Sequence, residues 1–221
     1  MKNSLIAFVP AALLAVAVIT YVDGVNENYS EKNQSKSIQT ENTAGKNEDA
    51  CCKVDEETGR YSENSIYLLN AKWKDQDGNS VELKKFAGKK VVLAMIYTSC
   101  PSACPVIVNE MQKLEAYIPK GEISSYRFVL VSIDPDRDTP QKLTQFAMER
   151  NLDKKNWTLL TGSKNEVAEL AELIGFNYKK SAYGNFSHSN LITVLNSEGV
   201  IENQSEGLNR SGEKLMTMLN K

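Results

Sequence analysis

The strongest signal for the fold is the run Val91-Val92-Leu93-Ala94-Met95-Ile96-Tyr97-Thr98-Ser99-Cys100-Pro101-Ser102-Ala103-Cys104-Pro105. Its first seven residues are apolar and start with β-branched side chains. They predict a buried central strand, because the run is too short to span a membrane. A helical pattern follows, in which Ile107, Met111, Leu114 and Ile118 share one face. The two cysteines therefore lie where a buried strand leads into a helix.

Cys100 and Cys104 occupy a position that favours thiolates. A helix N-terminus carries partial positive charge and unpaired N–H groups, and both lower the pKa of a thiol. The spacing predicts that the two side chains project from one helical face, so both sulfurs can bind one ion. His188 is the only histidine among 221 residues. Two soft sulfurs and one imidazole form a donor set that suits copper.

The rest of the chain alternates between strand and helix patterns. We expect strands at 66–69, 81–83 and 128–133, a turn at 75–79, and a hairpin formed by 191–195 and 200–201. Helices are expected after the N-cap Thr139-Pro140, after the capping box Ser163-Lys164-Asn165-Glu166, and from about Gly212. This order predicts an α/β fold with the cysteines at the carboxyl end of a strand, where open α/β sheets bind ligands.

The N-terminal 63 residues differ from the rest in composition. Residues 5–22 are almost continuously apolar and form either a cleaved signal peptide or a membrane anchor. The anchor is favoured because the apolar run continues past the candidate cleavage site Ala15-Val16-Ala17. Residues 23–63 are polar and predict a flexible tether, which leaves 64–221 as the folded domain. The charges flanking the run, Lys2 before it and Asp23 and Glu27 after it, predict that the domain lies outside the cytoplasm. The run is not preceded by an Arg- and Ser-rich transit peptide, so we expect the periplasmic side of a bacterial inner membrane.

The charge balance argues against a nucleic-acid partner. The chain has 26 lysines and arginines against 28 aspartates and glutamates, for a net charge of −2. No segment is strongly basic, so the electrostatic attraction that dominates nucleic-acid binding is missing.

Three motifs in order resemble those of the Sco/SenC family of copper-binding, thioredoxin-fold proteins. They are residues 97–105, residues 131–140 (Val131-Ser132-Ile133-Asp134-Pro135-Asp136-Arg137-Asp138-Thr139-Pro140), and His188-Ser189 before a strand and hairpin. Residues 157–162 are also similar, and the resemblance covers about 66–220. It implies a thioredoxin-like α/β fold, with a central mixed β-sheet flanked by helices. It also implies that Cys100, Cys104 and His188 bind copper, as Cu(I) or Cu(II).

The same resemblance implies a membrane-tethered protein that handles copper and thiols for the dinuclear copper site of cytochrome c oxidase. Its partners would be an upstream copper donor, a thiol reductant, and the apo copper subunit of the oxidase or another copper protein. The alternative is a thiol–disulfide oxidoreductase in which Cys100 and Cys104 keep a target's cysteines reduced. A peroxide-reducing enzyme of related fold is less favoured, because no arginine adjoins Cys100.

Each residue of this set also has a simpler interpretation. The two cysteines fit a structural disulfide, and a lone histidine is usually a surface or core residue. Pro101 and Pro105, the strand-to-helix junction and the distant histidine favour the functional interpretation, which rests mainly on the resemblance. In thioredoxin-type enzymes a cis-proline occupies the position that His188 has here, just before a strand. No proline of this chain lies at that position. The family commonly has aspartate before this histidine, whereas this chain has Ser187.

Asp134, Asp136 and Asp138 follow a strand end. Turn and cap chemistry is the favoured interpretation, because carboxylates are hard ligands that bind Cu(I) poorly. Asp134 and Asp138 remain auxiliary candidates, with docking or tuning of the cysteines as their role. The methionines Met95, Met111 and Met148 are predicted to fill the core rather than to bind copper.

Cys51-Cys52 on the tether leaves several interpretations open. Neighbouring cysteines rarely bridge each other, because their Cα atoms are only about 3.8 Å apart. The pair is either incidental, an intermolecular link, or an auxiliary site for a soft metal. Our hypothesis is that it passes copper to, or exchanges disulfides with, Cys100 and Cys104.

Overall fold

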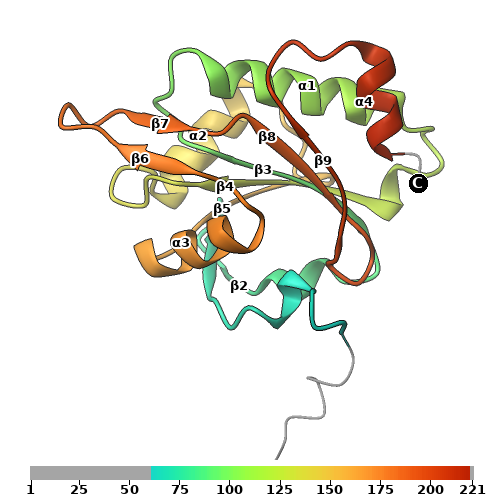
Figure 1. Ribbon diagram of the computed structural model, residues 1–221, viewed down its shortest axis with the longest axis horizontal. Helices are drawn as coiled ribbons and strands as arrows, with labels where there is room; N and C mark the ends of the chain where they lie inside the picture. The colour runs from blue at the N-terminus through green and yellow to red at the C-terminus, as the bar shows by residue number, and fades with distance from the viewer. Residues whose placement is uncertain (1–60, 220–221) are drawn as a thin grey trace, which may run out of the picture. The chain divides into compact units, whose positions relative to one another are not determined.

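The computed structural model describes residues 61–219. A seven-stranded mixed sheet has the strand order β2-β1-β5-β4-β3-β8-β9, and β6 and β7 form a separate two-stranded sheet (Figure 1). The strands are β1 Trp73–Asp75, β2 Ser80–Val81, β3 Lys90–Ile96, β4 Tyr126–Ser132, β5 Trp157–Thr161, β6 Tyr178–Lys180, β7 Phe186–His188, β8 Leu191–Leu195 and β9 Ile201–Glu206. The helices are α1 Ala103–Tyr117, α2 Pro140–Glu149, α3 Lys164–Leu173 and α4 Gly212–Leu219, with 3-10 turns η2 Ile66–Leu68, η3 Leu83–Phe86 and η4 Ile123–Ser125.

The predicted anchor and the tether as far as residue 60, including Cys51 and Cys52, lie outside the described residues. Within residues 61–219, no helix combines the length and the apolar character needed to cross a membrane.

The centre of the sheet is the parallel trio β5-β4-β3, with β8 antiparallel beside β3. Helices α1, α2 and α4 cover one face of the sheet and α3 covers the other (Figure 1). With helices on both faces, a central strand needs apolar side chains in both directions. Residues 91–96 of β3 are accordingly all buried, and the strands expected at 91–97 and 128–133 are confirmed as β3 and β4.

Two helices begin at the caps that the sequence predicted. The Thr139 hydroxyl accepts the N–H of Lys142 at the start of α2, and Pro140 opens the helix. The Ser163 hydroxyl accepts the N–H of Glu166, and the Glu166 carboxylate accepts the N–H of Ser163 in return. These caps satisfy N–H groups that have no partner within the helix.

Other local predictions were wrong. Residues 66–68 form a 3-10 turn instead of a strand, because the Ser65 hydroxyl caps the turn and the Ile66 N–H binds the Gly199 carbonyl. β2 ends at Val81, and Leu83 begins η3. The strands β5, β6 and β7 were not predicted. β6 and β7 have three residues each, which leaves little periodicity to detect.

The methionine prediction holds in part. Met95 and Met111 are buried, but Met148 on α2 is 73 % exposed. It lies on the outer face of a helix whose buried residues are Leu143, Phe146 and Ala147.

Candidate metal centre

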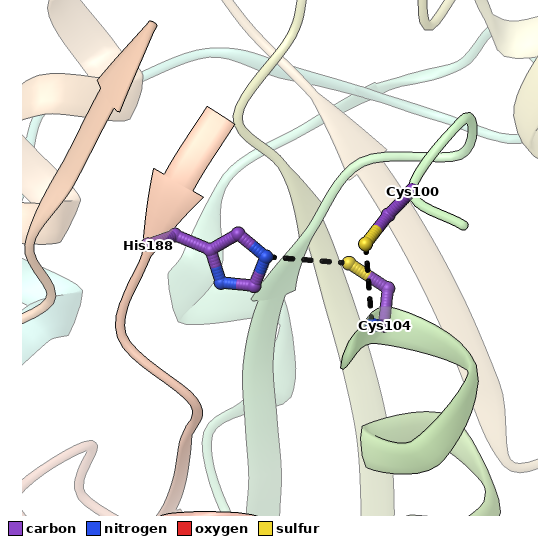
Figure 2. A group of neighbouring side chains, drawn as sticks. All are labelled: Cys100, Cys104 and His188. Atoms are coloured by element: carbon purple, nitrogen blue, oxygen red, sulfur yellow. Dashed lines mark hydrogen bonds between the residues drawn. The ribbon is translucent and has the colours of Figure 1, made fainter. Parts of the chain in front are cut away.

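The sheet topology brings the distant histidine to the cysteines. β3 ends at Ile96, so Cys100 and Cys104 follow its carboxyl end. β8 is antiparallel to β3, with Ala94 opposite Ile192, so the first residues of β8 lie beside the last residues of β3. His188, three residues before β8 begins, therefore reaches the loop that carries the cysteines (Figure 2).

Cys100, Cys104 and His188 form one compact group. Their ligand atoms lie within 4.8 Å of one another, and Cys104 Sγ is 3.8 Å from His188 Nε2. Bonds of 2.0–2.3 Å in a trigonal arrangement would separate ligand atoms by about 3.5–4.0 Å. Both cysteines are free and buried, and the histidine is half-buried. The donor set and its spacing fit a single soft ion.

The expectation that both cysteines share one helical face was wrong. Helix α1 starts at Ala103, so Cys104 lies in its first turn while Cys100 lies in the preceding loop. Pro101 disfavours helical backbone at Cys100, the residue before it. The Cys100 sulfur turns back over the helix start and accepts the N–H of Cys104 at 3.4 Å, as Figure 2 shows.

The two thiols differ in acidity. Burial by itself would raise the pKa of Cys100, but N–H groups of Cys104 and Ser102 and the His188 ring stabilise the thiolate and lower this pKa to about 6. Burial raises the pKa of Cys104 far above its usual range, and the neighbouring Cys100 thiolate adds to the rise. The predicted effect of the helix N-terminus thus holds for Cys100 and fails for Cys104, because Cys104 is more deeply buried.

His188 is held by groups that the sequence did not reveal. It ends strand β7 instead of lying in a loop. Its Nδ1 donates to the Ser189 carbonyl at 2.8 Å, which fixes the ring with Nε2 toward the sulfurs. A backbone carbonyl thus orients the ring in place of a carboxylate at position 187. The Phe176 ring stacks on the imidazole and the Tyr97 ring meets it edge-on, with ring centroids 5.9 Å apart in both pairs.

Asp138 shapes the loop that leads to Cys100. Its buried carboxylate accepts the N–H and hydroxyl of Thr98 and the hydroxyl of Ser132. It thereby joins the ends of β3 and β4, and it does not belong to the group of potential metal ligands.

Asp134 connects the same region to the β6–β7 hairpin. Its buried carboxylate pairs with Arg137 and with Lys180, at 3.2 Å from the lysine. Arg137 also donates to the Gly184 carbonyl at the hairpin turn, at 2.6 Å. Asp136 is half-exposed and pairs with Lys164 and Lys180. The three aspartates therefore make turn, loop and ion-pair contacts.

The family model described as SCO1/SenC matches residues 68–220 of this chain. Among curated proteins, the SCO1 protein homolog of Bacillus subtilis (strain 168) is 34 % identical over 100 residues, which is 45 % of this chain and 51 % of that protein. The chain spans about half to three fifths of the length of the first curated relatives that it matches.

Solved structures share the fold. The structure of Arabidopsis thaliana ScoI with copper bound has a TM-score of 0.58 and 24 % identity, and the match covers 67 % of this chain and 92 % of that one. BsSco is described as a member of the Sco family of cytochrome c oxidase assembly proteins in which a disulfide switch was identified. Its TM-score is 0.56 at 26 % identity, and the match covers 66 % of this chain and 87 % of that one. The thioredoxin-like α/β architecture expected from the sequence agrees with these likenesses.

Proposed function

The chain belongs to the SCO1/SenC family, and we propose that it is a copper metallochaperone. Copper is its cargo, held by Cys100, Cys104 and His188 and delivered to the dinuclear copper site of cytochrome c oxidase. The observation that carries the proposal is the convergence of two sulfurs and one imidazole nitrogen within 4.8 Å. Such a donor set suits copper better than it suits hard cations.

The acidity of the thiols sets the conditions for loading. Cys100, with a pKa of about 6, offers a thiolate at neutral pH, whereas Cys104 keeps its proton until an ion displaces it. Loading requires the reduced dithiol, which links copper binding to the thiol redox state. Release proceeds by ligand exchange, in which an acceptor thiolate replaces one protein ligand at a time. His188, the more exposed ligand, is the natural first point of exchange.

The test is a Cu(I) titration of the reduced protein against a competing chelator, with wild type beside His188→Ala. We expect one tightly bound equivalent, with a large loss of affinity in the variant. Ser187→Ala is a matched control, because its side chain is exposed on the same strand. Weak binding that does not depend on His188 would contradict the proposal.

A second candidate is thiol–disulfide exchange, favoured by the pKa of about 6 at Cys100 beside a second thiol. Here the Cys100 thiolate attacks a target disulfide and one target sulfur leaves as a thiolate. Cys104 then loses its proton and attacks Cys100, which releases the second target thiolate and leaves a Cys100–Cys104 disulfide. The variant Cys104→Ser should trap the mixed disulfide on a model disulfide substrate. His188→Ala should largely spare exchange while it weakens copper binding, so the two activities can be separated.

We further propose that residues 5–22 anchor the chain and that the folded domain lies on the periplasmic side of a bacterial inner membrane. The apolar run and the tether composition support this arrangement. Membrane fractionation with protease protection tests it, and release of the domain without membrane lysis would contradict it. Replacing Cys51 and Cys52 together by serine tests their role in copper relay. Unchanged copper stoichiometry and unchanged maturation of the target would contradict that role.

A further inference from the structure

A buried arginine connects the cysteine helix with the segment that follows the histidine. The side chain of Arg210 is 1 % exposed and pairs with the carboxylate of Glu110, which is 2 % exposed. Glu110 lies on α1, six residues after Cys104. Arg210 lies in the short segment between β9 and α4, 100 residues after Glu110 in the sequence.

The guanidinium of Arg210 contacts three parts of the domain at once. Nη1 donates to Glu110, Nε donates to the Ser205 hydroxyl at 2.9 Å, and Nη2 donates to the Asn190 carbonyl at 2.9 Å. The backbone N–H of Arg210 also donates to the Glu110 carboxylate, at 2.7 Å. Asn190 follows His188 by two residues, and the carbonyl of the intervening Ser189 is the one that orients the imidazole.

The stability of the fold does not by itself explain why Arg210 and Glu110 are buried as a charge pair. Removing two charges from water is costly, and apolar residues of similar volume often serve stability equally well. The planar fork of an arginine, however, fixes several acceptors in one rigid geometry, which an ammonium group cannot do. Here the acceptors lie on the helix of Cys104, on β9 and in the chain next to His188.

We propose that Arg210 is a positioning residue for copper binding, which sets His188 against Cys104 through its contacts with Glu110 and Asn190. The inference rests on the proposed function, because it concerns the same three-ligand site. It predicts that Arg210 contributes to copper affinity through His188.

The test is a double-mutant cycle on the full chain, with Cu(I) affinity measured against a competing chelator. Arg210→Lys keeps a cation next to Glu110, but a single ammonium cannot also hold Ser205 and Asn190. Arg210 acts on His188 through Asn190, so we expect Arg210→Lys to weaken binding about tenfold in the wild-type background, the low end of the loss that follows removal of a group bonded directly to a ligand. In the His188→Ala background the same substitution should have little further effect.

Arg127→Lys is the matched control. Arg127 lies near the start of β4, at the end of the sheet away from the cysteines, and donates to the Lys155 carbonyl. Its replacement should leave copper affinity unchanged in both backgrounds. If Arg210→Lys does not fold, the pair Glu110→Gln with Arg210→Met replaces it, because this pair buries no charge and Gln still offers an acceptor to the backbone N–H.

The possible results distinguish a failure of the Arg210 inference from a failure of the proposed copper site. An equal loss in both backgrounds would mean that Arg210 supports the fold or the cysteines alone, and no loss in either would mean that it has no role in binding. Each of these results overturns the inference while the three-ligand site stands. If His188→Ala by itself leaves the Cu(I) affinity unchanged, the proposed function itself is refuted.

Discussion

At the residue scale, the two cysteines of the site have different chemical roles. Cys100 lies before α1, and its sulfur accepts hydrogen bonds from N–H groups at the helix start. Cys104 lies inside the first turn and is fully buried. Their pKa values consequently shift in opposite directions. Cys100 is the thiolate at neutral pH, and Cys104 is the protonated partner.

This difference predicts the pH dependence of alkylation. Above a pKa of about 6 Cys100 is deprotonated, so its reaction with iodoacetamide should level off above about pH 7 and slow as the pH falls below 6. Cys104, whose pKa is raised, should react slowly throughout the neutral range in a Cys100→Ser variant. Peptide mass spectrometry over time gives both rates. Equal rates with a common midpoint near 8.5 would contradict the assignment.

Asp138 is the residue on which the cysteine loop depends. Asp138→Asn replaces one acceptor oxygen by a donor facing the N–H or hydroxyl groups of Thr98 and Ser132. We expect a loss of about 1–3 kcal/mol in the free energy of unfolding, measured by urea denaturation. Asp136→Asn is the control, because Asp136 makes exposed ion pairs and should change stability much less. Equal effects of the two substitutions would refute the role given to Asp138.

At the element scale, the β6–β7 hairpin determines where His188 lies. The hairpin is a separate two-stranded sheet, which is marginally stable by itself. Arg137 and Lys180 attach it to the loop after β4, and Phe186 packs on Tyr97 with ring centroids 5.2 Å apart. Its position therefore depends on tertiary contacts.

Arg137→Met removes the bond to the Gly184 carbonyl, which attaches the hairpin to the loop after β4, and the ion pair with Asp134, which holds the guanidinium in that loop. We expect amide hydrogen exchange in β6 and β7 to accelerate about three- to tenfold, in line with the roughly 0.5–1.5 kcal/mol of one hydrogen bond. Exchange in β3 and β4 should stay unchanged. Lys179→Met, at an exposed position of the same hairpin, is the control. If both variants exchange alike, the contact with Gly184 does not hold the hairpin.

At the scale of the whole molecule, binding at the proposed site should stabilise the fold. The ligands come from the loop before α1, from α1 itself and from β7, so unfolding separates them. At a free Cu(I) concentration 100 times the Kd, the gain is about 2.7 kcal/mol, which for a domain of this size raises Tm by about 5–10 °C.

Thermal unfolding of the reduced protein with and without Cu(I) measures this gain. His188→Ala should gain less, and the double variant Cys100→Ser with Cys104→Ser should gain nothing. An equal rise in the double variant would show that copper acts elsewhere on the protein.

Elements with local signals could be predicted from the sequence alone. The apolar run of β3 and β4, the Thr139 and Ser163 caps, and the strand-to-helix junction of the cysteines depend on neighbouring residues, and all were predictable. Met148 shows where local signals are not enough. A methionine in a helix is buried only if its side of the helix packs on the sheet, and Met148 lies on the exposed side of α2.

The construction of the site depends on contacts between residues that are distant in the chain. The two cysteines and the histidine of the site could be named from the sequence, but the antiparallel register of β8 against β3 brings His188 Nε2 to 3.8 Å from Cys104 Sγ. Its orientation comes from a backbone carbonyl, and its connection to α1 comes from Arg210 and Glu110, which are 100 residues apart. These contacts have no local pattern, because residues distant in the chain meet only when the sheet forms. For the same physical reason, the opposite pKa shifts of the two thiols follow from burial and hydrogen bonds in the folded domain.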